Sequence, residues 1–105
     1  MDLTVEIYRQ TKLFPTEEKF GLVSQMNRAV VSVPSNIAEG HGRNSTGEYI
    51  QHLGIAKGSL CELETQIEIS RRLGYIADSE TDSLLEKCTI INKQLVTLIK
   101  SLKSR

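Results

Sequence analysis

The sequence predicts an all-α protein, an antiparallel up-and-down four-helix bundle formed by residues 1–105 as a single domain. Apolar residues recur at steps of three and four through most of the chain, which is typical of helices that bury one stripe. No segment alternates apolar and polar residues as a half-buried strand does. The connections between the periodic segments are short, so consecutive helices are expected to be antiparallel neighbours.

The first predicted helix spans residues 2–14 and ends there because Pro15 disfavours helical geometry in the residue before it. The second begins at Thr16 as its N-cap, has acids in its first turn and is ended by the pair Gly40 and Gly42. Pro34 removes a backbone hydrogen bond inside this helix, so we expect a kink. Because the first helix is the shortest, one end of the bundle should be less well covered. The predicted apolar stripes comprise Leu3, Ile7, Phe14, Phe20, Val23, Val30, Val33 and Ile37.

The third predicted helix begins with a capping box at residues 45–48 and stops at Gly74. Asp78 or Ser79 is expected to cap the fourth helix, which continues to the carboxyl end. Both helices carry apolar residues at heptad spacing. The third stripe is Tyr49, Leu53, Ala56, Leu60, Leu63 and Ile67, and the fourth is Leu84, Cys88, Ile91, Leu95, Leu98 and Leu102.

The composition favours a soluble cytoplasmic protein. Thirteen basic residues balance thirteen acidic ones, so the bulk charge predicts no tight non-specific binding to nucleic acid or lipid. No apolar run suits a signal peptide or a membrane span. Cys61 and Cys88 lie in apolar-periodic segments without metal-site spacing, so we expect reduced thiols in the core and not a disulfide or a metal site.

No residues with the spacing of a catalytic site are present. His41 and His52 have no second ligand at metal spacing and are expected to be solvated or locally hydrogen-bonded. The charge of Glu62 would raise the pKa of the neighbouring Cys61 thiol and disfavour a nucleophile there. The glycines of residues 40–42 lack the lysine and the preceding strand of a phosphate-binding loop. We therefore expect no enzyme activity, no catalytic residue, no metal and no cofactor.

Small and polar residues replace the amphipathic pattern between residues 30 and 49. Asn36, Glu39 and Arg43 follow one another at steps of three and four, so they share one helix face or its edge. A charge buried among them would need a hydrogen-bonded partner. We interpret this region as a polar network or a subunit interface, with a small pocket as the alternative. Its predicted residues are Arg28, Ser32, Ser35, Asn36, Glu39, Arg43 and Glu62.

The last predicted helix is electrically polarised, because the chain has no acid after Glu86. The pattern complements the helix macrodipole, and it also suits a stripe that contacts nucleic acid. A few spaced bases on a neutral domain give weak, salt-sensitive affinity, which a ring of subunits would multiply. The candidate contacts are Lys87, Lys93, Lys100, Lys103 and Arg105.

Two long segments carry a family resemblance. They are RAVVSVPSNIAEGHGR (residues 28–43) and EYIQHLGIAKGSLCELETQIEISRRLGYI (residues 48–76), preceded by FP..E.FGL..Q over residues 14–25. Together they resemble the small bacterial four-helix-bundle proteins of the intervening sequences of 23S ribosomal RNA genes. The resemblance covers nearly the whole chain. It implies a bundle assembled into a homopentameric ring, and it does not imply an enzyme.

A related branch, the accessory proteins of diversity-generating retroelements, forms similar pentamers that are basic and bind nucleic acid and a reverse transcriptase. This chain differs from that branch in its zero net charge, and Asn27 stands where the family often has an arginine. We expect a non-enzymatic oligomeric binding or scaffolding protein whose partners are copies of itself and RNA or a nucleic-acid-bound protein, away from membranes. The alternative is a structural ring that docks a protein partner and binds no nucleic acid.

Overall fold

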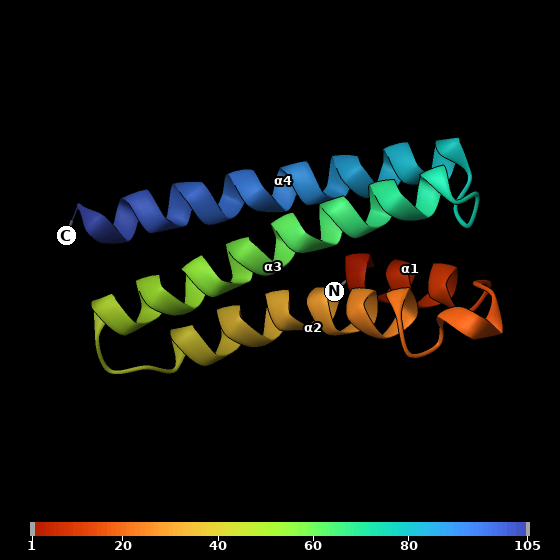
Figure 1. Ribbon diagram of the computed structural model, residues 1–105. Coiled ribbons are helices and arrows are strands. Elements are labelled where there is room, and N and C mark those ends of the chain that lie inside the picture. Colours follow the sequence, from red (N-terminus) through yellow and green to blue (C-terminus); the bar gives the residue numbers. More distant parts are fainter. Residues whose placement is uncertain (1, 105) are drawn as a thin grey trace.

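The computed structural model describes residues 2–104, which form four α-helices and one short 3-10 helix (Figure 1). Within this range no strand occurs, which confirms the all-α prediction. The elements are α1 (Asp2–Thr11), η1 (Thr16–Glu18), α2 (Leu22–His41), α3 (Thr46–Arg72) and α4 (Asp78–Lys103).

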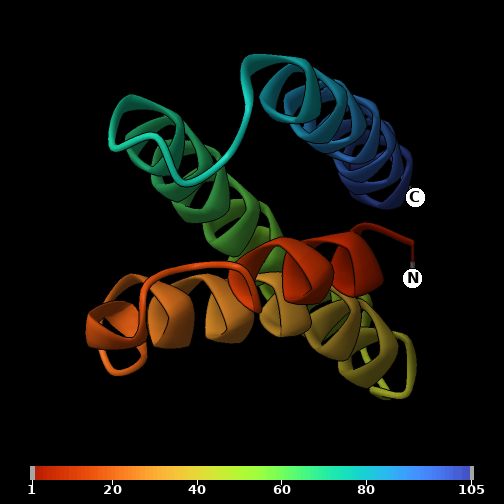
Figure 2. The same ribbon diagram turned by 90° about the vertical axis from the view of Figure 1, so that its right-hand side faces the viewer.

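The helices form an up-and-down bundle in which α3 packs between α2 and α4 (Figure 1). The helix α1 lies against α2, as the turned view in Figure 2 shows, and it also contacts α4. At ten residues, α1 is much shorter than the 26-residue α4. Its first residues, Asp2 and Leu3, reach Ile90 and Ile91 near the middle of α4. The carboxyl-terminal half of α4 therefore extends past α1, as the short first helix predicts.

The stripe of α3 forms the centre of the core. Burying a leucine or isoleucine side chain stabilises a fold by about 1.5–3 kcal/mol, so this helix organises the bundle. Tyr49, the first predicted member of the stripe, is only half-buried. The members without exposed surface are Leu53, Ala56, Leu60, Leu63 and Ile67. Facing them are the buried residues Leu3, Ile7, Met26, Val30, Val33, Leu84, Cys88, Leu95 and Leu102.

The entry into α2 differs from the prediction. The helix α1 ends at Thr11, and a separate 3-10 turn occupies the position predicted for the start of α2, which begins only at Leu22. Phe20 lies in the connection and is 89% exposed, so its predicted place in the core is wrong. The carboxylate of Glu18 takes over the capping role, because it accepts the backbone N–H of Leu22 (3.4 Å) and the hydroxyl of Tyr75 (2.9 Å).

The remaining helix ends are partly as predicted. The Oγ of Ser45 accepts the backbone N–H of Glu48 at 3.1 Å, which confirms the predicted cap of α3. Gly74 follows α3 with φ of 79°, and the N–H of Tyr75 bonds to the carbonyl of Ser70 as in a Schellman motif. The predicted cap of α4 is wrong: its N-cap is Ala77, which has no side-chain acceptor.

The second helix is continuous through its proline. It runs without a break past Pro34, and the kink expected there stays a prediction. Of the two glycines predicted to end this helix, Gly42 is its C-cap, whereas Gly40 lies inside α2.

Candidate functional site

Polar side chains join α2 to α3 along the seam between these helices. The Oγ atoms of Ser32 and Ser59 lie 2.8 Å apart. Asn36 Nδ2 donates to the Oγ of Ser32 at 3.0 Å and to the Ser32 backbone carbonyl at 2.9 Å. His52 Nδ1 lies 3.1 Å from Asn36 Oδ1. All four side chains are half-buried, so they form a partly shielded polar network.

The orientation of Asn36 determines which atoms of this network donate. Its Nδ2 bonds to a backbone carbonyl, which only accepts, so the amide oxygen is the atom that faces His52. An amide oxygen also only accepts, and His52 Nδ1 must therefore carry the hydrogen. In this arrangement His52 Nδ1 donates to Asn36 Oδ1.

Close contact between the helices accompanies this network. A Cβ on Gly40 of α2 would lie 2.7 Å from His52 Cβ and 3.0 Å from Tyr49 Cδ1. Side chains do not approach that closely, so glycine is required at this position. Gly40 was expected to stop the helix; it instead lets the α2 backbone approach the first turns of α3, where His52 reaches Asn36.

The sequence predicts two of the four network members, Ser32 and Asn36. It does not assign His52 or Ser59 to the network, although it allows a locally hydrogen-bonded His52. The available signal was their spacing, since residues seven apart lie on the same side of a helix. Which side of α3 faces α2, and in which register, follows only from the packing of the two helices.

The other predicted network residues lie at the surface. Glu39 and Arg43 form an ion pair of 2.5 Å one turn apart, with 56% and 42% of their side chains exposed. Arg28, Ser35 and Glu62 are exposed, and none of the three bonds to the network. None of the charged side chains in this region is buried. A buried network of charged residues, as the sequence allowed, therefore does not form within residues 2–104.

The predicted basic stripe of α4 divides into two parts. Lys87 is half-buried and forms an ion pair with Glu6 of α1, so it is not a free contact. Lys93, Lys100 and Lys103 are exposed, and none of the ion pairs found over residues 2–104 includes them. The remaining candidate, Arg105, lies outside the described residues.

One lysine that the sequence analysis missed joins this basic region. Lys57 of α3 is exposed and precedes Glu64 by seven residues, so both lie on the same side of the helix. Glu64 borders a groove that also contains Leu85 of α4. Lys103 follows Leu85 by five full helical turns and shares its side of α4. Lys57 and Lys103 therefore lie on facing sides of α3 and α4.

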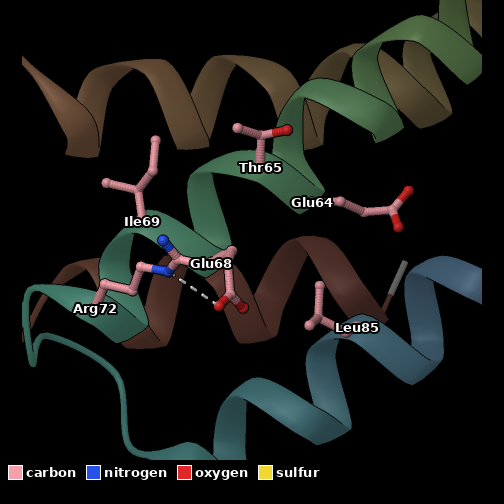
Figure 3. A pocket seen from close by; sticks show the side chains of 6 residues that line it. All are labelled: Glu64, Thr65, Glu68, Ile69, Arg72 and Leu85. Atoms are coloured by element: carbon pink, nitrogen blue, oxygen red, sulfur yellow. Dashed lines mark hydrogen bonds and ion pairs between the residues drawn. The ribbon is translucent and has the colours of Figure 1, made fainter.

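The groove between α3 and α4 has a volume of about 480 Å³ and is shown in Figure 3. Glu68 lies at its centre and bonds to both Arg71 and Arg72. The hydrogen bond from Arg71 is the main cause that lowers the pKa of the Glu68 carboxyl. This carboxylate is therefore held in its charged form and is poorly suited to act as a general acid or base. The lining residues are Glu64, Thr65, Glu68, Ile69, Arg72 and Leu85.

The two cysteines lie in different environments. Cys88 is buried, and burial, with a smaller effect of Glu64, raises the pKa of its thiol to about 12. Cys61 is exposed, so its predicted place in the core is wrong. Both thiols are free.

Metal and membrane sites are not found in the described part of the chain. Over residues 2–104, no group of three His, Cys, Asp or Glu side chains is placed to hold a metal ion. None of the helices in that range combines the length and the apolar character needed to cross a membrane.

Comparison with known proteins gives the family. The family model of the 23S rRNA-intervening sequence proteins matches residues 1–97. The chain belongs to this family. No curated protein matches it.

A solved member of the same group has a similar fold. It is the crystal structure, at 1.70 Å resolution, of a protein with unknown function from the S23 ribosomal protein family of Bacteroides thetaiotaomicron. The two chains are 31% identical and superpose with a TM-score of 0.87, over 94% of this chain and 89% of that chain. The family resemblance expected from residues 14–76 is thereby confirmed.

Proposed function

We propose that this protein is a non-enzymatic, self-associating scaffold of the bacterial cytoplasm that binds RNA or a nucleic-acid-bound protein. The observation that supports RNA binding is the set of exposed lysines at the open end of the bundle. Lys93, Lys100 and Lys103 extend past α1 on α4, and Lys57 borders the same region from α3. No acid follows Glu86 to offset them.

The small number of exposed lysines on one chain limits its affinity for RNA. Three or four lysines neutralise few phosphates, so a single chain would bind RNA weakly and lose affinity steeply with salt. Several copies held together raise the effective concentration of the lysines and the overall affinity without any new contact. Assembly into a homopentameric ring, as the family resemblance implies, would supply these copies.

Exposed apolar side chains support self-association. Over residues 2–104, nine large hydrophobic side chains expose more than a third of their surface. They are Val5, Tyr8, Leu13, Phe20, Val31, Ile55, Ile69, Leu73 and Ile90. Light scattering behind a sizing column should give a mass of about five chains at both low and high salt, since apolar contacts survive salt. A single-chain mass under both conditions would contradict self-association.

The RNA proposal is tested by the salt dependence of binding. The anisotropy of a labelled single-stranded RNA, titrated between about 50 and about 200 mM salt, gives the slope of log K against log salt. In the double variant Lys93→Glu, Lys100→Glu this slope should become smaller by about 1.4, because each single-strand phosphate contact contributes about 0.7. The control is Lys12→Glu in the turn after α1, also an exposed lysine, which should leave the slope unchanged.

The alternative is a ring that docks a protein and binds no nucleic acid. A groove of about 480 Å³ on the open half of α4, with Leu98 in its wall, favours this alternative. If the protein binds its partner equally well with and without the charge reversals and at every salt concentration, the result would support the protein-docking alternative. It would contradict the RNA proposal.

A further inference from the structure

The exposed side of α4 in its carboxyl-terminal half combines cations with short polar groups. Lys93 and Lys100 are seven residues apart, so both lie on the same side of the helix, about 10 Å apart along it. Uncharged polar side chains follow beside them at steps of three and four, and all are exposed. We call this surface the polar face of α4: Lys93, Gln94, Thr97, Lys100 and Ser101.

The charge around the polar face is positive. On α4 no acid follows Glu86, and in the α3 segment 49–61 the one charged residue is Lys57. The acids that border this segment, Glu48 and Glu62, lie at its two ends. A surface of this kind attracts a polyanion.

Aromatic side chains, on which unpaired bases stack, do not accompany the lysines. The helix α4 contains no Phe, Tyr or Trp. Among residues 2–104 the exposed aromatic side chains are Tyr8 and Phe20, on α1 and in the connection before α2. Tyr49 of α3 is half-buried, and its ring meets the edge of His41 with the centroids 5.8 Å apart. Stacking supplies much of the affinity of proteins that bind single strands, and the polar face offers none.

We infer that the polar face of α4 binds the phosphates and 2′-hydroxyls of an RNA duplex and does not contact unpaired bases; this inference rests on the RNA binding proposed above. Lysine ammonium groups bind phosphate as point charges. Hydroxyl and amide side chains both donate and accept hydrogen bonds, as a 2′-hydroxyl requires. Duplex RNA is recognised mostly through contacts of these two kinds across its minor groove.

Charge density favours a duplex over a single strand where no base is contacted. The affinity then comes from released counterions, and each phosphate contact contributes a salt slope of about 0.9 on a duplex against about 0.7 on a single strand. For three or four lysines, this difference corresponds to about fivefold tighter binding of the duplex at about 0.1 M salt.

The width of a helix favours RNA over DNA as the duplex. An α-helix with its side chains is about 10–12 Å across, whereas the minor groove of B-DNA is about 6 Å wide. The minor groove of an RNA duplex is wide and shallow and displays the 2′-hydroxyls, which DNA lacks. The short side chains of Thr97 and Ser101 would lie against this groove, with Lys93 and Lys100 at the phosphates that border it.

Three nucleic acids of equal length test the inference. They are a labelled RNA hairpin, an RNA of the same base composition that forms no stem, and a DNA hairpin of the same sequence. Fluorescence anisotropy at about 0.1 M salt should show the RNA hairpin bound about fivefold tighter than the unpaired RNA. The RNA hairpin should also bind more tightly than the DNA hairpin, because only RNA offers 2′-hydroxyls.

A double variant separates the hydroxyl contacts from the charge. Thr97→Val, Ser101→Ala removes two exposed hydroxyls without changing the net charge. It should abolish the preference for the RNA hairpin over the DNA hairpin and leave the salt slope unchanged, since the lysines remain. The matched control is Ser83→Ala, an exposed serine in the acidic half of the same helix, which should keep the preference.

The outcomes distinguish this inference from the proposed RNA binding. If the unpaired RNA binds as tightly as the RNA hairpin, the inference fails while RNA binding stands. If the RNA and DNA hairpins bind equally and the double variant changes neither, the 2′-hydroxyl contact is overturned. If no nucleic acid binds even at low salt, the proposed RNA binding fails, and this inference fails with it.

Discussion

Gly40 of α2 lies so close to His52 of α3 that a Cβ on the glycine would be 2.7 Å from the histidine Cβ. The contact belongs to the same seam as the hydrogen bond between His52 and Asn36. Close packing of backbone and a polar network therefore occur together where α2 meets the amino-terminal part of α3. This seam holds the two helices in a single register.

We predict that Gly40→Ala destabilises the fold. The added methyl group would force α2 away from α3, and overpacking of this kind costs about 1–3 kcal/mol, partly offset by the better helix propensity of alanine. The free energy of unfolding from urea titration measures the effect. Gly47→Ala is the control, because a Cβ there meets nothing within 4 Å and should not lower stability. Equal stability of both variants would show that the seam tolerates a side chain at position 40.

The polar seam predicts that alanine substitutions at two neighbouring polar residues of α2 lower the free energy of unfolding by different amounts. Asn36→Ala removes the partner of His52 and of Ser32 and should lower the free energy of unfolding by about 1–2 kcal/mol. Glu39→Ala removes only an exposed ion pair and should change it by less than about 1 kcal/mol. Chemical denaturation of both variants side by side provides the measurement. A larger loss in Glu39→Ala than in Asn36→Ala would contradict this account of the seam.

The two cysteines should react at different rates. Cys61 is exposed, whereas Cys88 is buried and its thiol pKa is raised to about 12, so it stays protonated near neutral pH. Only the thiolate attacks disulfide reagents. A thiol reagent added to the folded protein at mildly alkaline pH should therefore label one site, and Cys61→Ser should remove that signal. Both sites should react after denaturation, and rapid labelling of Cys88 in the folded state would contradict its buried position.

Cys88 should also make stability depend on alkaline pH. Its thiol pKa is about 12 in the folded chain against a reference value of 9.0, so folding favours the protonated form. This contribution is fully present below about pH 9 and is lost as the pH rises through about 12. Across that window the loss approaches about 1.4 kcal/mol per pH unit. Cys88→Ala should show a shallower decline than the unaltered protein, and parallel curves would show that Cys88 does not contribute.

Sequence reasoning succeeds where the cause is local or periodic. The heptad stripe of α3 is buried from Leu53 to Ile67 because helical spacing alone collects those side chains on one side. The cap at Ser45 and the stop at Gly74 depend on residues within one turn. Sequence reasoning fails where contacts between distant segments decide the path of the chain. Phe20 is an example: helical spacing places it in the core, but it lies exposed in the connection before α2.

By itself, the sequence determined the all-α class, the order of the helices, most of the core and the family, because these follow from periodicity, capping residues and an ordered motif. Only the tertiary structure decided which polar residues meet. Lys87 pairs with Glu6, 81 positions away, and Asn36 bonds to His52 because the approach at Gly40 sets one register of α2 on α3. A pairing between helices depends on their relative rotation and height, and no spacing within a single helix contains that information.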